Sequence, residues 1–263
     1  GLEVCRRLNE EQILVTLDHL GENVTSEEEA RLSANAYLAP LREIHQRGLR
    51  GSLSLKLTQI GLDLSEDLCR ENIERIVSEA ASFGGFVEID MESSEYVDRT
   101  LRIVTAMHQR FGCVRGVVQA YLRRSADDIA TLNRLGVPVR LCKGAYKESA
   151  SVAFARKREV NENYALLMRK LLTEGNYPGL ATHDETLIKE VLRFTKEQGI
   201  GPDRFEFQML YGIRRDLQQW LVSQGYRLRL YVPYGDAWYP YFMRRLAERP
   251  ANVFFLARNL LRQ

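Results

Sequence analysis

Short apolar segments alternate with longer charged segments along almost the whole chain, and this alternation limits the possible fold more than any other feature. The apolar segments are rich in β-branched residues, as strands are. They cover residues 13–18, 52–57, 86–91, 114–121, 137–142, 179–182, 205–210 and 228–232. In the charged segments, apolar residues recur every three or four positions, as in helices. These predicted helices cover residues 27–46, 65–82, 95–111, 126–135, 151–173, 184–197, 213–223 and 236–247.

Strict alternation predicts a parallel sheet, because every crossover between parallel strands needs a connection such as a helix. Eight strand–helix units allow the sheet to close as a (β/α)8 barrel, and we expect one such domain over residues 13–263. An open doubly wound sheet is the alternative, but residues 19–23 (HLGEN) lack the glycine-rich phosphate loop expected after its first strand. Residues 1–12 are expected to be the remnant of an N-terminal arm.

Composition excludes several classes of protein. Hydrophobic residues make up 45% of the 263 residues, which is enough for a large core. The formal net charge of +2 argues against binding nucleic acid through bulk charge. No apolar stretch approaches the ~18 residues of a membrane span, and no secretory leader is recognisable. The four cysteines, Cys5, Cys69, Cys113 and Cys142, lack the spacing of a zinc site or a disulfide framework, so a cytoplasmic protein without a metal site is expected.

Polar residues stand at the carboxyl ends of the predicted strands, where barrel enzymes carry their active sites. They are Lys56, Asp90, Gln119, Arg140, Lys143, Thr182, His183, Gln208 and Tyr231. Burying Lys56, Asp90 or Arg140 inside an apolar strand costs several kcal/mol unless each is paired or meets a ligand. The sequence therefore predicts a binding or catalytic site at this end of the barrel.

The residue types at this site indicate its chemistry. Basic residues outnumber the single acid, Asp90, and Arg244 and Arg245 follow in the last predicted helix. Several cations favour an anionic ligand, such as a carboxylate or a phosphate-bearing cofactor. No serine–histidine or cysteine–histidine arrangement and no phosphate-binding Walker loop is recognisable. A cofactor is therefore expected to supply the chemistry.

Six motifs in order resemble the proline dehydrogenase family. They are LKLT at 55–58, RLCKGAY at 140–146, ATHD at 181–184, FEFQMLYG at 205–212, YVPYG at 231–235 and YFMRRLAE at 241–248. The second and the last are together highly specific, and the length resembles that of the monofunctional bacterial enzymes. The resemblance implies a distorted (β/α)8 barrel with non-covalent FAD that oxidises L-proline to Δ1-pyrroline-5-carboxylate. It also implies electron transfer to a membrane quinone, peripheral contact with the inner membrane and a pyrroline-5-carboxylate dehydrogenase as partner.

The resemblance assigns roles to particular residues. It implies that Lys56, Arg244 and Arg245 hold the substrate carboxylate, and that Asp90, Leu210 and Tyr231 line the substrate pocket. The implied FAD contacts are Arg140 beside N5, Gln119 on the ring, Lys143, Gly144 and Ala145 near the pyrophosphate, and Thr182, His183 and Glu248. Glu22 resembles a gate residue that pairs with Arg244. Lys147 departs from the family, since many relatives have tryptophan there.

Three other functions remain open at this point. Hydroxyproline dehydrogenase uses the same scaffold, but the bulky phenol of Tyr231 leaves little room for a ring hydroxyl. Methylenetetrahydrofolate reductase is a related flavin barrel, in which the Arg244–Arg245 pair has no purpose. A catalytically inactive barrel that binds partners would be expected to lose these motifs, and none is lost.

Overall fold

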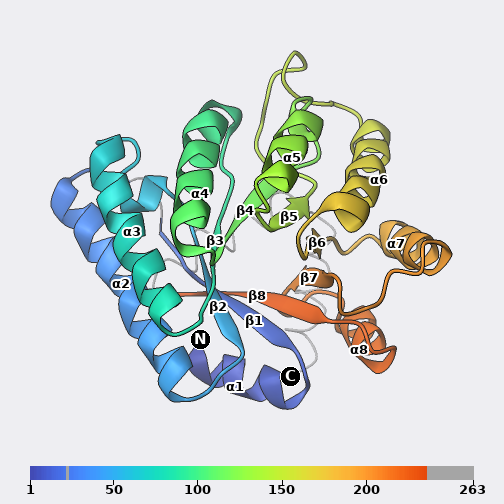
Figure 1. The fold of residues 1–263 in the computed structure, drawn as a ribbon, viewed down its shortest axis with the longest axis horizontal. Helices are drawn as coiled ribbons and strands as arrows, with labels where there is room; N and C mark the ends of the chain where they lie inside the picture. The colour runs from blue at the N-terminus through green and yellow to red at the C-terminus, as the bar shows by residue number, and fades with distance from the viewer. Residues whose placement is uncertain (22–23, 236–263) are drawn as a thin grey trace, which may run out of the picture.

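Eight parallel strands close into a barrel in chain order, with each strand paired to the next and β8 paired to β1 (Figure 1). The computed structural model describes residues 1–21 and 24–235. The strands are β1 (Leu14–His19), β2 (Gly51–Leu55), β3 (Val87–Ile89), β4 (Val114–Gln119), β5 (Val139–Cys142), β6 (Gly179–Ala181), β7 (Glu206–Leu210) and β8 (Leu228–Tyr234). The helices are α1 (Leu2–Glu10), α2 (Glu27–Gln46), α3 (Glu66–Ser82), α4 (Val97–Phe111), α5 (Ser125–Arg134), α6 (Lys157–Glu174), α7 (Glu185–Glu197) and α8 (Arg215–Ser223).

The predicted (β/α)8 barrel is confirmed, and each predicted strand is present with its ends moved by at most two residues. The helix predicted over 151–173 starts later, at Lys157, where the Glu159 side chain accepts a hydrogen bond from the backbone of Arg156. The residues before it form a long loop that makes an antiparallel bridge between Leu122 and Ala153. The helix predicted over 236–247 lies outside the described residues.

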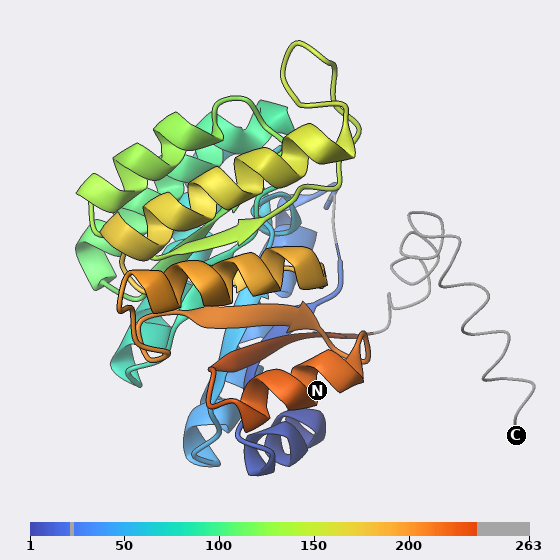
Figure 2. The ribbon, with the colours of Figure 1, turned by 90° about the vertical axis from the view of Figure 1, so that its right-hand side faces the viewer.

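Helix α1 was not predicted from the sequence. Its Cys5 and Leu8 are buried in the same apolar cluster as the strands and the other helices. Arg7 donates a hydrogen bond to the Tyr211 hydroxyl just after β7, and the views in Figures 1 and 2 place α1 between α8 and α2. Residues 2–10 are therefore part of the outer helical layer rather than an appendage to it.

The strands alternate between an apolar outer face and a polar inner face. In β8, Leu228, Leu230 and Val232 are buried within the main apolar cluster, which includes residues of the surrounding helices. The residues between them make polar contacts inside the barrel, Arg229 with Glu206 of β7 and Tyr231 with Asp90 just after β3. Three helices that follow strands begin at side-chain caps, because Ser26, Ser65 and Asp184 accept hydrogen bonds from backbone amides of the first turn.

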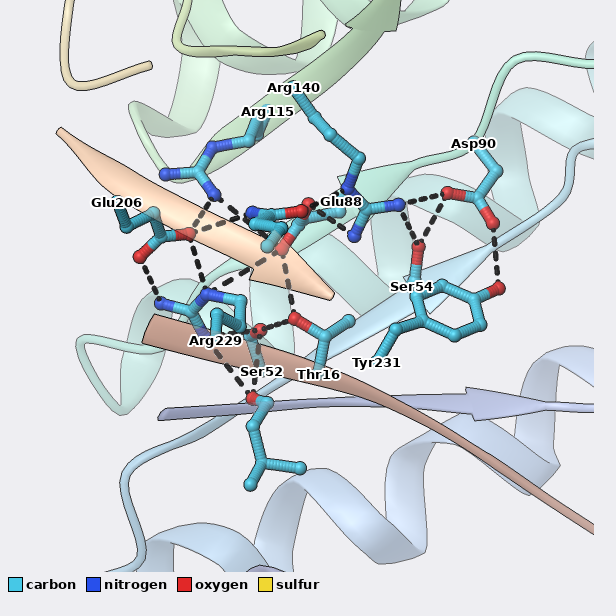
Figure 3. A network of polar contacts seen from close by, with 12 residues as sticks. Thr16, Ser52, Ser54, Glu88, Asp90, Arg115, Arg140, Glu206, Arg229 and Tyr231 are labelled. Atoms are coloured by element: carbon cyan, nitrogen blue, oxygen red, sulfur yellow. Dashed lines mark hydrogen bonds and ion pairs between the residues drawn. The ribbon is translucent and has the colours of Figure 1, made fainter. Parts of the chain in front are cut away.

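The interior of the barrel holds a network of buried ion pairs instead of the branched apolar residues common in such barrels (Figure 3). At its centre, the Glu206 carboxylate accepts a hydrogen bond of 2.6 Å from Arg115 and two, of 2.7 and 3.1 Å, from Arg229. Glu88 accepts a bond of 2.9 Å from Thr16 and pairs with Arg140. Glu206 and Glu88 therefore both have charged partners, as the removal of a carboxylate from water requires.

Charge is balanced in this interior among the described residues. The carboxylates are those of Asp18, Glu88, Asp90 and Glu206, and the cations are Lys56, Arg115, Arg140 and Arg229. The two guanidinium groups around Glu206 lower the pKa of its carboxyl group far below the usual range, against the opposing effect of burial. No helix in the described part of the chain combines the length and apolar character needed to cross a bilayer.

Replacing Glu206 tests the network. We expect Glu206→Gln to lower the free energy of unfolding at pH 7 by about 3–5 kcal/mol, because Arg115 and Arg229 then face an uncharged amide. Since the folded pKa of Glu206 is lowered, its contribution is fully present above the unfolded pKa of about 4.3 and is lost as the pH falls. The variant should therefore have a flatter stability curve below pH 5, measured by urea unfolding.

Glu190→Gln is the matched control, because Glu190 pairs with Arg169 on the outer helices rather than inside the barrel. This surface pair should change stability by less than about 1 kcal/mol. Equal destabilisation by the two variants would contradict a special role for the interior network.

Candidate active site

The carboxyl ends of four strands bring together a cluster of ionisable side chains. Lys56 directly follows β2, Asp90 directly follows β3, Arg140 lies in β5 and Tyr231 lies in β8. The Asp90 carboxylate is the centre of the cluster, because it accepts hydrogen bonds of 2.6 Å from Arg140, 2.9 Å from Tyr231 and 2.7 Å from Ser54 (Figure 3). Its pKa is lowered by these groups and by Lys56, whose Nζ lies 3.6 Å away, despite burial. Asp90 is therefore an anion that organises the site.

Arg140 is 6% exposed and is bound by acceptors on several sides. Its Nε donates to Gln208 Oε1 at 2.6 Å, its Nη1 donates to Asp90, and its Nη2 pairs with Glu88. The guanidinium carbon also lies 5.3 Å from the centre of the Tyr231 ring. Burial works against the charged form, but Glu88 and Asp90 prevail and raise the pKa of Arg140, so it is a permanent cation.

Lys56 lies between two carboxylates. Its Nζ is 3.7 Å from Asp18 Oδ2 and 3.6 Å from Asp90 Oδ2, and these neighbours raise its pKa although burial opposes the charge. Asp18, at 0% exposed, has a raised pKa because desolvation outweighs the attraction of Lys56. Lys56 is therefore charged and directed toward the centre of the barrel mouth.

The expected excess of cations is wrong for the described residues. Asp18 and Glu88 were not predicted as site residues, and with Asp90 they place three carboxylates beside the two cations Lys56 and Arg140. The signal was present in the sequence, because Asp18 and Glu88 stand at the alternate positions of their strands that turn inward. Any net positive charge at this site must come from beyond the described residues or from the rim.

The other side of the barrel mouth carries further predicted residues. Gln119 donates from Nε2 to the Met91 carbonyl at 3.3 Å, while its buried Oε1 has no hydrogen-bond partner among the described residues. Lys143 pairs with Asp184 at 2.8 Å, and the Thr182 hydroxyl accepts from the Asp184 backbone N–H. His183 Nε2 accepts from the Leu210 N–H at 2.9 Å, which assigns the proton of a neutral ring to Nδ1.

Gly144 forms a tight turn beside Tyr121. Its φ of +100° is unfavourable for other residues, and a Cβ at this position would lie 2.1 Å from Tyr121 Cδ1. Ala145, Tyr146 and Lys147 are exposed on the loop that follows. Backbone amides without a side chain in front, an unpartnered buried amide oxygen at Gln119 and a nearby lysine fit a planar cofactor that bears phosphate groups.

The structure thus brings Lys56, Asp90, Arg140, Leu210 and Tyr231 to one end of the barrel, along with Gln119, Lys143, Gly144, Ala145, Thr182 and His183. Four predicted site residues, Glu22, Arg244, Arg245 and Glu248, lie outside the described residues. A closed (β/α)8 barrel with paired ionisable groups at the carboxyl ends of its strands defines a barrel enzyme.

Comparison with known proteins gives the family. The family profile described as "Proline dehydrogenase" matches residues 2–258. Proline dehydrogenase 2 of Bacillus subtilis (strain 168) is 44% identical over 263 residues, 100% of this chain and 87% of that protein. Proline dehydrogenase of Deinococcus radiodurans is 42% identical over 267 residues, 100% of this chain and 86% of that protein. The chain belongs to the proline dehydrogenase family and is an oxidoreductase.

A solved structure agrees with the fold. Proline utilization A (PutA) from Bdellovibrio bacteriovorus, inactivated by N-propargylglycine, has a TM-score of 0.87 and 26% sequence identity to this chain. The match covers 93% of this chain and 31% of that chain, so the barrel spans about a third of the larger protein.

The pair between Lys56 and Asp18 can be tested without any ligand. We expect Asp18→Asn to lower the pKa of Lys56, because the largest attraction that opposes its desolvation is removed. NMR titration of ¹³C-labelled lysine side chains measures this change. Asp67→Asn, at an exposed residue in the first turn of α3, is the control and should leave that pKa in place. An unchanged Lys56 pKa in Asp18→Asn would show that Asp90 alone sets the charge.

Proposed function

We propose that the chain oxidises L-proline to Δ1-pyrroline-5-carboxylate with non-covalently bound FAD as its cofactor. The observation that carries this proposal is the cluster of Lys56, Asp90, Arg140 and Tyr231 at the mouth of a barrel of this family. The cluster offers a cation for a carboxylate, an aromatic face for a small ring and a permanent cation beside them. L-proline has the matching groups, a carboxylate and a small saturated ring.

The cofactor side of the proposal depends on Arg140, Gln119 and the loop after β5. FAD, when bound, supplies the group that accepts a hydride. Arg140 carries a permanent positive charge and, if it lies beside that group as proposed, would stabilise the negative charge that reduction creates. Gln119 Oε1 can accept a hydrogen bond from a ring N–H. Lys143 and the backbone of Gly144 and Ala145 would hold the pyrophosphate, with Thr182, His183 and Glu248 as further contacts.

The substrate side depends on residues from opposite strands. Lys56 would bind the proline carboxylate together with Arg244 and Arg245, since guanidinium groups bind carboxylates in a fixed direction. Asp90, Tyr231 and Leu210 would line the pocket, with the Tyr231 phenol held by its bond to Asp90. This arrangement would direct C5 of the ring toward the cofactor. Glu22 would close the site by pairing with Arg244.

The amine of proline must be neutral before it can release a hydride, so the rate should rise with pH through the pKa of the bound amine. The electrons are proposed to pass to a membrane quinone during peripheral contact with the inner membrane. The product is proposed to pass to a pyrroline-5-carboxylate dehydrogenase.

Cofactor binding is tested first on the wild-type protein and then on Gly144. Denaturing the purified protein should release free FAD, and a colourless protein that does not bind added FAD would contradict the proposal. Gly144→Ala should raise the dissociation constant of FAD about tenfold, because its Cβ collides with Tyr121 and its φ is strained. Gly136→Ala is the matched control, since Gly136 also has a positive φ but a Cβ there meets nothing within 4 Å.

Substrate choice is tested at Tyr231, where hydroxyproline dehydrogenase is the alternative. A phenol fixed over the ring by Asp90 excludes a ring hydroxyl by shape, which gives discrimination on the order of 10²-fold. Tyr231→Ser should lower kcat/KM for proline and lower it far less, or raise it, for 4-hydroxyproline. The measurement is the ratio of the two kcat/KM values. A ratio that does not move would make Tyr231 a packing residue.

A further inference from the structure

One strand of the barrel leaves a space at the level of Arg140. In the register of the sheet, Arg140 of β5 pairs with Gly179 of β6, and Gly179 pairs with Glu206 of β7. Gly179 has no side chain to place between them. Gln208, two residues after Glu206, has its Nε2 only 2.6 Å from where a Gly179 Cβ would stand. The Gln208 side chain therefore crosses β6 through the space that the glycine leaves.

The Gln208 amide makes one hydrogen bond at each of its two polar atoms. Its Oε1 accepts from Arg140 Nε at 2.6 Å, and its Nε2 donates to Glu206 Oε1 at 2.7 Å. Reversing the amide would set its NH2 group against a guanidinium donor and its oxygen against a carboxylate, so only one orientation is stable. Gln208 is 4% exposed, so water does not replace either partner.

Gln208 controls the part of Arg140 that the carboxylates do not hold. Glu88 and Asp90 bind the two terminal nitrogens, Nη2 and Nη1, while Nε is bound by Gln208. With only the terminal nitrogens held, the group can turn about the line that joins them. A third bond at Nε fixes the plane of the guanidinium group.

We propose that Gln208 is a positioning residue that sets the plane of Arg140 toward the bound flavin. This inference rests on the proposed function, because it takes Arg140 to face FAD. Glu206, itself held by Arg115 and Arg229, accepts a hydrogen bond from Gln208 Nε2, so the deep ion-pair network and the barrel mouth are joined by one amide.

Gln208→Ala is the first test, with Thr195→Val on α7 as a control for loss of a buried polar group. Gln208→Ala should lower kcat for proline about tenfold and leave KM within about twofold. The reason is that it loses a hydrogen bond to a charged group away from the residues proposed to bind the proline carboxylate. The midpoint potential of the bound flavin should become more negative, since a misplaced cation stabilises the reduced ring less. A purely structural role would lower thermal stability and leave the potential unchanged.

A second readout uses the apoprotein. Solvent exchange of the Arg140 Nε–H, followed by NMR on protein with ¹⁵N-labelled arginine and assigned by its loss in Arg140→Lys, should accelerate about tenfold or more in Gln208→Ala. Exchange that stays slow would show that Gln208 does not hold Nε, and this would overturn the inference.

Gly179→Ala tests the same contact from the other side. Its Cβ would push Gln208 off Arg140, while Arg115 Nη1 at 3.3 Å needs to move by only a few tenths of an ångström. We expect Gly179→Ala to lower kcat and the potential in the wild-type background and to have no further effect in Gln208→Ala. Additive losses in the double variant would overturn the inference. A wild-type protein that holds no FAD would instead refute the proposed function.

Discussion

The balance of charge inside the barrel is the constraint on which the rest of the structure depends. Four carboxylates and four cations share a space that most barrels fill with apolar side chains, and removing any one of them unbalances the charge of the buried interior. Glu206 illustrates the point, because it accepts hydrogen bonds from Arg115, Arg229 and Gln208 at once. The strands must therefore keep a single register, since a slip by one residue would point the charged side chains of a strand outward, into the apolar layer between strands and helices.

The same network prepares the site at the barrel mouth. Arg140 and Lys56 are held as cations by carboxylates of the barrel interior, so their charge does not depend on a ligand. Asp90 links the two, because Arg140 donates a hydrogen bond to its Oδ1 and Lys56 lies near its Oδ2. Substitutions among these residues should be strongly non-additive, since each changes the partners of the others.

The sequence predicted the architecture well because eight alternations of strand and helix have few other solutions. It predicted the functional end of the barrel from Lys56, Asp90 and Arg140, and the structure brings these three into contact. Glu88 and Asp18 were missed, although Asp18 is the last residue of the first predicted strand and the two-residue period puts Glu88 on the same inner face as Asp90. Helix α1 was missed because it has only nine residues and no strand before it. The hydrogen bond between Arg140 and Gln208 could not be predicted from the sequence. It depends on Gly179 lying beside them in the intervening strand β6, and only the register of the sheet shows this.

The pairing of β1 with β8 determines when the barrel can close. The first helix and the first strand meet elements from the far end of the described chain, because β1 pairs with β8 over six residue pairs and α1 contacts Tyr211. During synthesis from the N-terminus, the edge of β1 that pairs with β8 must wait until more than two hundred further residues have been made. Contacts of such long sequence separation make folding slow. The growing chain therefore carries an open strand edge until β8 emerges, and this is the surface that a chaperone would need to shield.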